Sequence, residues 1–298
     1  MVQKVIELKW PMNWKTEFVK VTPRVYAYVQ AIEKIGKIGI SNAGLIVGKQ
    51  HAAIVDTLTT AAMTREFLKK VRSVTDSDIR YVLNTHHHPD HTFCNHLIPE
   101  AVSIGQNNCR MMLLKWIKLG QPNIKMLQAD NPTWDHSESR LTPTDVTFDK
   151  TLTLYLDNLE IRLLYFGIAH SNSDIVVHIP EESVVFVGDL VFPELPRRRE
   201  AGSYLNWTKV LSKIAELNAK FYIPGHGRVT DREGVLRCLD ILQSYHKDGK
   251  KAFEAGLTPD EVVEKMKSGK FKQFVEADPK WFKRLLGTLY EELGQKKA

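Results

Sequence analysis

The sequence predicts an α/β protein in which helices cover the outer faces of β-sheets. Two observations lead to this fold class. Short apolar segments of strand length recur along most of the chain, and segments with helical spacing lie between and after them. In addition, 43% hydrophobic and 26% charged residues over a length of 298 are ordinary for a chain that buries a sizeable core. A disordered chain, a collagen-like repeat and a disulfide-stabilised miniprotein are therefore excluded.

The first half of the chain begins the alternation of strands and helices. Apolar segments at 44–47 and 52–56 flank a short polar stretch, which predicts a β-hairpin. A helix is expected over 64–74, followed by a short apolar strand over 81–83. An apolar and basic helix is then predicted around 109–119.

The middle of the chain opens with a segment that has no clear period. Residues 120–149 contain many Pro, Asn, Asp and Ser residues. We expect a long loop here, and such loops in compact domains are often functional. Alternation over 152–156 and apolar residues over 161–166, 175–178 and 184–187 then predict four strands.

The last third of the chain is predicted to be largely helical. Apolar residues recur at helical spacing over 207–217. Thr230 and Thr258 each precede a glutamate by three residues, the spacing of a capping box that opens a helix. The Lys-rich tail over 265–298 is expected to be mostly helical, with its charges on a solvated face.

Composition restricts the partners and the compartment. The net charge of +6 favours anionic partners, but it does not supply the dense basic surface that nucleic-acid binding needs. The three cysteines are widely spaced and form no disulfide framework. Because no signal-type segment and no run of 18 apolar residues are found, we expect a cytoplasmic protein without a membrane partner.

The strongest chemical signal is a group of four histidines directly after a predicted strand. Residues 85–91 are Thr-His-His-His-Pro-Asp-His. Side chains alternate in an extended segment, so His86 and His88 are expected to point the same way and bind one cation. His87 then points away and is given no metal role. Asp90 and His91 follow the turn and are candidates to bind a second cation.

Three later positions each place a metal-binding side chain after a predicted strand. They are His170, Asp189 and His226. Each one alone is a weak signal, because Gly-His and Gly-Asp pairs are common in loops. Together, in this order, they are a strong one. The set contains imidazole and carboxylate groups and no thiolate, which suits Zn, Mn, Fe, Co or Ni.

These residues together resemble the seven-ligand set of the metallo-β-lactamase-fold hydrolases. The resemblance covers residues 36–242 and implies an αββα sandwich with a dinuclear site at one edge. We assign this domain to residues 1–250 and place appended helices over 251–298. The resemblance implies one metal ion on His86, His88 and His170, a second on Asp90, His91 and His226, and Asp189 as the bridge between them. Asp56, which ends the predicted hairpin, would orient the histidine-rich segment.

The resemblance implies a hydrolase with two divalent metal ions, for which Zn is our first expectation. Two cations about 3.5–4 Å apart share a hydroxide, because binding lowers the pKa of water toward ~7. That hydroxide would attack an ester-type substrate, and Asp90 is the candidate catalytic residue that orients it and moves a proton. We expect a promiscuous enzyme that favours phosphoesters. Thioester or lactone hydrolysis is the alternative, and a non-catalytic metal- or nucleic-acid-binding protein is the alternative of another class.

Differences between this sequence and the motifs of related enzyme groups narrow the range of expected activities. β-Lactamases of this fold lack the bridging aspartate, so Asp189 predicts β-lactamase activity that is minor at most. Flavodiiron oxygen reductases carry Glu where this chain has His88. The motif is also similar to that of hydroxyacylglutathione hydrolases (glyoxalase II), although Ile168 and Ala169 stand where those have Pro-Gly. The residues that follow Asp90 and Asp189 resemble a branch that includes relay-type hydrolases.

Residues of the substrate pocket are predicted from their distance along the chain to the ligands. Phe93 and Phe192 lie two or three residues from predicted ligands and are candidates for apolar walls. Arg197 is a candidate for binding an anionic small molecule. Tyr204 and Trp207 are candidates for the mouth of the site. The physiological substrate and the formation of a homodimer are left open.

Overall fold

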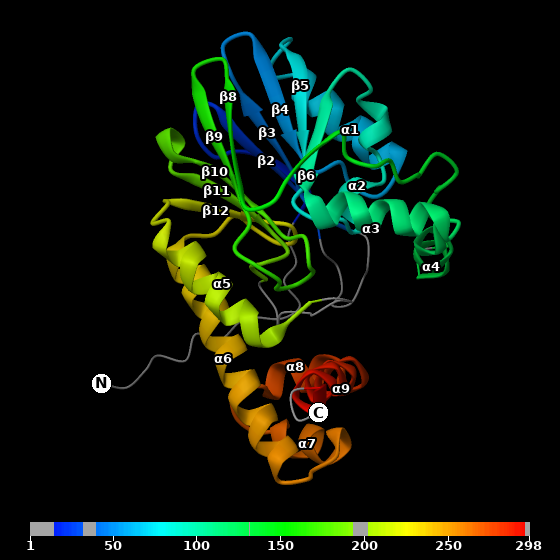
Figure 1. Ribbon diagram of the computed structural model, residues 1–298, viewed down its shortest axis with the longest axis vertical. Coiled ribbons are helices and arrows are strands. Elements are labelled where there is room, and N and C mark those ends of the chain that lie inside the picture. The colour runs from blue at the N-terminus through cyan, green and yellow to red at the C-terminus, as the bar shows by residue number, and fades with distance from the viewer. Residues whose placement is uncertain (1–14, 32–39, 131, 193–201, 296–298) are drawn as a thin grey trace.

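Two β-sheets pack face to face between helices in the computed structural model, which describes residues 15–31, 40–130, 132–192 and 202–295 (Figure 1). Within these residues one sheet runs in the order β1 to β7, and the other in the order β12-β11-β10-β9-β8. The helices lie on the outer faces. This αββα arrangement confirms the predicted fold class.

The strands of the first sheet are β1 (Glu17–Lys20), β2 (Val25–Val29), β3 (Ala43–Val47), β4 (His51–Val55), β5 (Asp78–Leu83), β6 (Val102–Gln106) and β7 (Val146–Phe148). The strands of the second are β8 (Thr151–Leu156), β9 (Leu159–Leu164), β10 (Val176–Ile179), β11 (Val184–Gly188) and β12 (Phe221–Pro224). The hairpin predicted around residues 44–56 is confirmed as β3 and β4, which pair antiparallel. β4 and β5 pair parallel, as do β11 and β12.

The core between the sheets follows from the alternation of side chains along each strand. In β2, Val25, Ala27 and Val29 face the second sheet, whereas Tyr26 and Tyr28 pack beneath helix α1 (Ala61–Arg72). Both faces of the strand are thus buried. Other strands of both sheets divide their side chains in the same way. One apolar layer therefore lies between the two sheets, and one lies between each sheet and the helices that cover it.

Helices cover both outer faces of the sandwich (Figure 1). On the side of the first sheet lie α1, α2 (Pro89–Thr92), α3 (Asn107–Lys118) and α4 (Pro122–Asp130). On the side of the second sheet lie α5 (Tyr204–Glu216) and α6 (Arg232–Glu254). α6 extends beyond the sheet and packs against α9 (Pro279–Gln295), which also contacts α7 (Pro259–Met266) and α8 (Lys272–Ala277). The predicted helical tail is confirmed.

Some sequence-based boundaries are wrong. The expected loop over 120–149 contains α4 and the edge strand β7. Pro122 begins α4, and the nine residues of this helix show no clear helical period in the sequence. Thr230 does not cap α6, because its backbone pairs with Tyr222 in an isolated bridge, and Asp231 caps the helix instead. The capping box at Thr258 is present.

Several features bear on the organisation of the chain. The boundary predicted at residue 250 falls inside α6, and one apolar cluster joins the second sheet to α5, α6 and α9. All three cysteines are buried and free. None of the described helices combines the length and the apolar composition that crossing a bilayer requires. The domain division and the cytoplasmic location stay predictions.

Candidate metal centre

The seven predicted ligands follow the carboxyl ends of strands from both sheets. Residues 86–91 follow β5 of the first sheet, while His170, Asp189 and His226 follow β9, β11 and β12 of the second. β10 is antiparallel to both β9 and β11, and β11 is parallel to β12, so these three strands end at the same edge. Packing of the two sheets then brings all seven side chains together.

The first group consists of His86, His88, His170 and Asp189, all buried. Nε2 of His86 and Nε2 of His170 lie 2.8 and 3.0 Å from Nδ1 of His88. Oδ2 of Asp189 lies 3.3 Å from Nε2 of His170. Three ring nitrogens and one carboxylate oxygen therefore converge on one point, as a tetrahedral cation site requires.

The second group consists of Asp90, His91 and His226. Nε2 of His226 lies 3.4 Å from Oδ2 of Asp90, and Nε2 of His91 lies 3.7 Å from the same oxygen. Asp189 lies between the two groups, because its Oδ1 is 3.3 Å from Nε2 of His91 and its Oδ2 is 3.3 Å from Nε2 of His226. This is the placement that a bridging carboxylate needs. The assignment of each side chain to a metal ion stays a prediction.

The chemistry of these groups fits divalent metal ions. Five imidazoles and two carboxylates within so small a buried volume offer many lone pairs and few protons to share among them. Gly225 is what allows their close approach, since a Cβ at this position would collide with Oδ1 of Asp189 and come within 2.9 Å of Cε1 of His91. The polypeptide thus leaves a cradle around Asp189 that a larger residue would fill.

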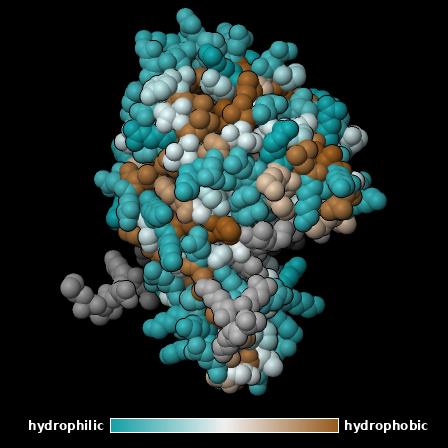
Figure 2. All heavy atoms as spheres, in the orientation of Figure 1, coloured by the Kyte–Doolittle hydropathy of each residue, from teal (hydrophilic) through white to brown (hydrophobic). Residues whose placement is uncertain are grey.

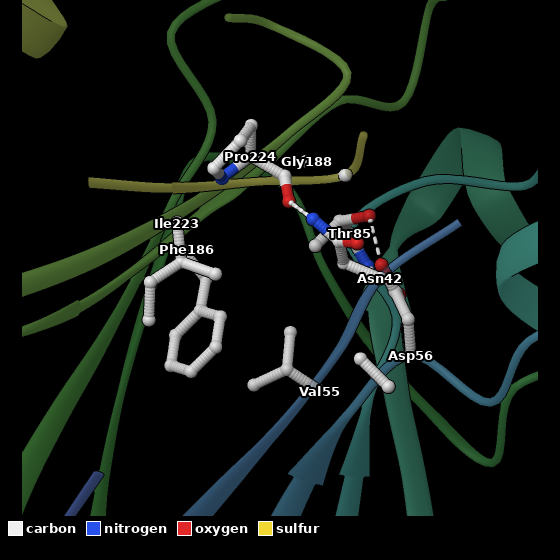
Figure 3. Close-up of a pocket in the computed structure, with 10 residues that line it drawn as sticks. Asn42, Val55, Asp56, Thr85, Phe186, Gly188, Ile223 and Pro224 are labelled. Atoms are coloured by element: carbon white, nitrogen blue, oxygen red, sulfur yellow. Dashed lines mark hydrogen bonds between the residues drawn. The ribbon is translucent and has the colours of Figure 1, made fainter. Parts of the chain in front are cut away.

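Asp56 contacts the histidine-rich segment, and the orienting role that the resemblance implies for it stays a prediction. Its carboxylate accepts hydrogen bonds from the backbone N–H and the hydroxyl of Thr85 at 2.8 and 2.7 Å. It also lies 2.8 Å from Nδ1 of His91. Figure 3 shows Asp56 and Thr85 side by side. Both line a small cavity of about 10 Å³. With Nδ1 of His91 bonded to a carboxylate, its Nε2 faces the centre.

Sequence reasoning missed Asn42, which holds the loop that carries His226. Its Nδ2 donates to the carbonyls of Pro224 and Gly227 at 2.9 and 2.7 Å, and its backbone N–H donates to that of Gly225 at 2.7 Å. Nδ1 of His226 itself lies 2.6 Å from the carbonyl of Ile40. The partners are about 180 positions apart, so no local pattern signals them.

The side chains of the centre differ in the protonation state that their surroundings favour. Burial lowers the pKa of His86 well below its ordinary value, and neighbouring His91 adds to this. Burial opposes ionisation of Asp189, yet the imidazoles of His226, His91 and His170 hold its pKa well below the usual range. Burial opposes the charged imidazole of His91 and His226, but Asp189 and Asp90 raise the pKa of His91 well above its ordinary value and also raise that of His226. His86 and Asp189 are thus in the neutral and ionised forms that bind a metal ion, whereas His91 and His226 must release a proton to bind one.

A second polar cluster lies beneath His170. Asp174 is fully buried and accepts hydrogen bonds from the backbone N–H and hydroxyl of Ser171 at 2.7 and 2.6 Å. Burial raises the pKa of Asp174 to about 7 despite these bonds. His87 points away from the centre, as predicted, and its Nδ1 lies 2.6 Å from Oγ of Ser173. Asp174 was not singled out from the sequence.

The structure brings some of the predicted pocket residues to the site and not others. The ring of Phe192 stacks on that of His226 with centroids 5.8 Å apart. The ring of Trp207 lies 5.6 Å from that of His170, but Trp207 is fully buried and does not line the mouth predicted for it. Phe93 and Tyr204 are fully buried in apolar clusters behind the site. Arg197 lies outside the described residues.

Comparison with known proteins identifies the family of this chain. The profile of the metallo-beta-lactamase superfamily matches residues 36–226, well over half of the chain. This chain belongs to the metallo-beta-lactamase superfamily. The narrower resemblance to the glyoxalase II and relay-type branch stays a prediction.

Individual superfamily relatives are distant. A linear primary-alkylsulfatase from Pseudomonas sp. (strain ATCC 19151) is 24% identical over 75% of this chain, which spans about half (49%) of that protein's length. A type 2 metallo-beta-lactamase from Bacteroides fragilis is 24% identical over 82% of this chain and 91% of its own. The solved metallo-beta-lactamase from Pontibacter korlensis has a TM-score of 0.60 at 19% identity, covering 77% of this chain and 99% of that one. These likenesses establish the shared fold.

Proposed function

We propose that this protein is a metal-dependent hydrolase of ester-type bonds, with phosphoesters as the preferred substrates. The convergence of seven metal-binding side chains from both sheets is the observation that carries the proposal. Such a site has more ligands than the four that a closed structural zinc site uses. The net charge of +6 supports an anionic substrate.

Two divalent ions, when bound, supply a water of lowered pKa and positive charge opposite the oxygen that becomes negative. The residues of this chain set the geometry. Asp189 fixes the separation of the two groups, and Asp56 and Asn42 hold the loops on either side. Asp90 is the more exposed of the two carboxylates in the centre, at 9% against 5%. We assign it the task of orienting the attacking water and moving its proton.

Relatives suggest which competing substrates to include. The name of the alkylsulfatase relative adds sulfate esters to the panel, because a sulfate ester is also an anionic ester. Because one relative is a type 2 metallo-beta-lactamase, a β-lactam is also assayed, although we expect it to be a poor substrate. Thioesters and lactones remain the principal enzymatic alternative.

The test is a matched initial-rate panel. The protein is stripped of metal, reloaded with Zn, Mn, Co or Ni, and assayed with a phosphodiester, an alkyl sulfate, a lactone, a glutathione thioester and a β-lactam. We expect the phosphodiester rate to exceed the others by roughly 100-fold, about 2.7 kcal/mol in transition-state stabilisation. A preference of that size for another substrate class would make that class, and not phosphoesters, the proposed substrate. If no substrate is turned over with any of these metals, the proposal that this protein is a hydrolase is wrong.

The bridging role of Asp189 gives a direct prediction. Asp189→Asn replaces one carboxylate oxygen by an N–H₂ group facing the ring nitrogens of the centre. We expect kcat to fall by at least about 100-fold with the fold retained, as followed by initial rates and circular dichroism. Asp240→Asn, which loses only an exposed ion pair with Lys270, is the matched control. Wild-type turnover in Asp189→Asn would contradict the bridge.

A non-catalytic metal- or nucleic-acid-binding protein is the alternative of another class. It predicts that the stripped protein retains salt-sensitive binding to RNA or DNA without any turnover. A filter-binding assay at two salt concentrations, run beside the rate panel, separates the two. We expect no retention of nucleic acid.

A further inference from the structure

The first turn of α5 lies against two of the three loops that carry predicted ligands from the second sheet, those of His170 and Asp189. The backbone N–H of Ser203 donates to the carbonyl of Ala169 at 2.8 Å. The side-chain amide of Asn206 donates to the carbonyl of Ile168 at 2.7 Å. Both acceptors directly precede His170. The start of α5 therefore fixes the backbone from which the His170 imidazole projects.

The same turn also holds the loop of Asp189. Nε1 of Trp207 donates to the carbonyl of Leu190 at 3.0 Å, one residue beyond the predicted bridging carboxylate. Its ring lies 5.6 Å from the ring of His170. Trp207 is fully buried. A shift of this turn by a fraction of an ångström would therefore move two ligand loops together.

A carboxylate from the far end of the chain holds this turn in place. Glu292 on α9 accepts hydrogen bonds from the hydroxyl of Ser203 at 2.6 Å, and from the backbone N–H groups of Tyr204 and Leu205 at 2.9 and 3.4 Å. Glu292 is 91% buried, since only 9% of it is exposed. An anionic group at a helix N-terminus satisfies N–H groups that lack helical partners and interacts favourably with the helix dipole.

We propose that Glu292 is a positioning residue for the metal centre. Through the first turn of α5 it fixes the loops of His170 and Asp189, so the C-terminal helices form part of the support of the site. The inference rests on the proposed metal centre, but not on the reaction that the centre catalyses. Its immediate consequence is a change in metal binding rather than in substrate choice.

A purely structural role for α9 makes a different prediction. α9 also packs through apolar side chains such as Leu285, which is 5% exposed within the cluster shared with α5 and α6. If α9 matters only for stability, two variants that lose the same free energy of unfolding should lose the same metal affinity. It then makes no difference whether apolar packing or the Glu292 carboxylate was removed. If Glu292 positions the ligands, the carboxylate variant affects metal binding more.

The experiment compares the Co²⁺ forms of the full-length wild-type protein, Glu292→Gln and Leu285→Ala. The Gln amide turns one oxygen acceptor into a donor that faces other donors. We expect Glu292→Gln to bind Co²⁺ about 10- to 100-fold more weakly, the range typical for groups that orient metal ligands, and to show an altered visible absorption spectrum. Leu285→Ala should lower the melting temperature as much or more, with an unchanged spectrum.

Two results would overturn the inference. One is wild-type Co²⁺ affinity and spectrum in Glu292→Gln, and the other is an equal loss of affinity in Leu285→Ala. Ser203→Ala, which removes one of the three donors to Glu292, keeps the test open if Glu292→Gln does not fold, and it should weaken Co²⁺ binding severalfold. A wild-type protein that binds Co²⁺ without turning over any ester counts against the proposed hydrolase and leaves this inference intact.

Discussion

Gly225 shows how much of the candidate centre depends on the absence of a side chain. A Cβ there would collide with Asp189 and come within 2.9 Å of Cε1 of His91, and neither neighbour is free to move because both are buried. We therefore expect Gly225→Ala to weaken metal binding by at least about 10-fold, measured by competition with a chromogenic chelator. Gly287→Ala is the control, since a Cβ at this position on α9 meets nothing within 4 Å. Equal affinities in the two variants would contradict this account.

Asp174 gives a pH-dependent prediction at the same scale. Burial raises its folded-state pKa to about 7, whereas an unfolded Asp titrates near ~3.9. The folded state thus retains a proton that the unfolded state has released, so its contribution to stability is complete below about pH 4 and is lost as the pH rises toward about 7. Asp174→Asn carries no titrating proton. The stability of the wild type relative to this variant should therefore fall by at most about 4 kcal/mol over that interval.

The measurement is urea unfolding of the metal-free proteins near pH 4.5 and near pH 7.5. Comparing wild type with Asp174→Asn cancels the titration of the histidines, which both proteins share. A difference that does not change with pH would show that Asp174 is ionised throughout in the folded state.

Individual residues differ in how far the sequence predicts them. The ligand candidates were found because His86 to His91 form one local motif and the others follow strands. Phe192 lies beside His226, as its position near Asp189 suggested. No sequence pattern predicts the roles of Asn42 and Glu292, because their partners are distant in sequence. Asn42 and Pro224 are 182 positions apart, and Ser203 and Glu292 are 89 positions apart. Only the packing of whole elements brings such pairs together.

At the scale of elements, alternation and helical spacing located most strands and helices, but not their ends. The helix expected over 64–74 is α1, which begins three residues earlier, where Thr60 accepts a hydrogen bond from the backbone N–H of Met63. The strand expected over 81–83 begins at Asp78. Polar residues at strand and helix ends carry no periodic signal, so their assignment depends on tertiary contacts.

The capping box of α7 tests whether helix stability and the metal centre are separable. Thr258 accepts from the N–H of Glu261, and the Glu261 carboxylate accepts from the N–H of Thr258. Thr258→Ala should lower the free energy of unfolding by about 1 kcal/mol, measured by urea denaturation. Co²⁺ affinity should not change, because α7 makes none of the contacts to the ligand loops described above. A weakened centre would mean that the C-terminal helices act on it as one body rather than through Glu292.

At the scale of the molecule, the centre joins two sheets whose facing sides pack through apolar side chains. The segment 86–91 belongs to the first sheet and His170, Asp189 and His226 to the second, so bound metal ions would tie the halves of the sandwich together. A ligand that binds only the folded state adds about 4 kcal/mol to stability at 1,000 times its dissociation constant. Chelation should therefore lower the melting temperature by several degrees.

The size of this shift should depend on pH. Imidazole must be neutral to bind a metal ion, so protonation competes with binding as the pH falls below the ordinary histidine pKa of ~6.5. We expect the gain in melting temperature on adding Zn²⁺ to be largest near pH 8 and to shrink steadily toward pH 5, as followed by calorimetry with metal content checked by elemental analysis. In His86→Ala/His226→Ala, which removes one ligand from each group, the gain should be lost at every pH. A gain that persists in the double variant would place the stabilising metal elsewhere in the chain.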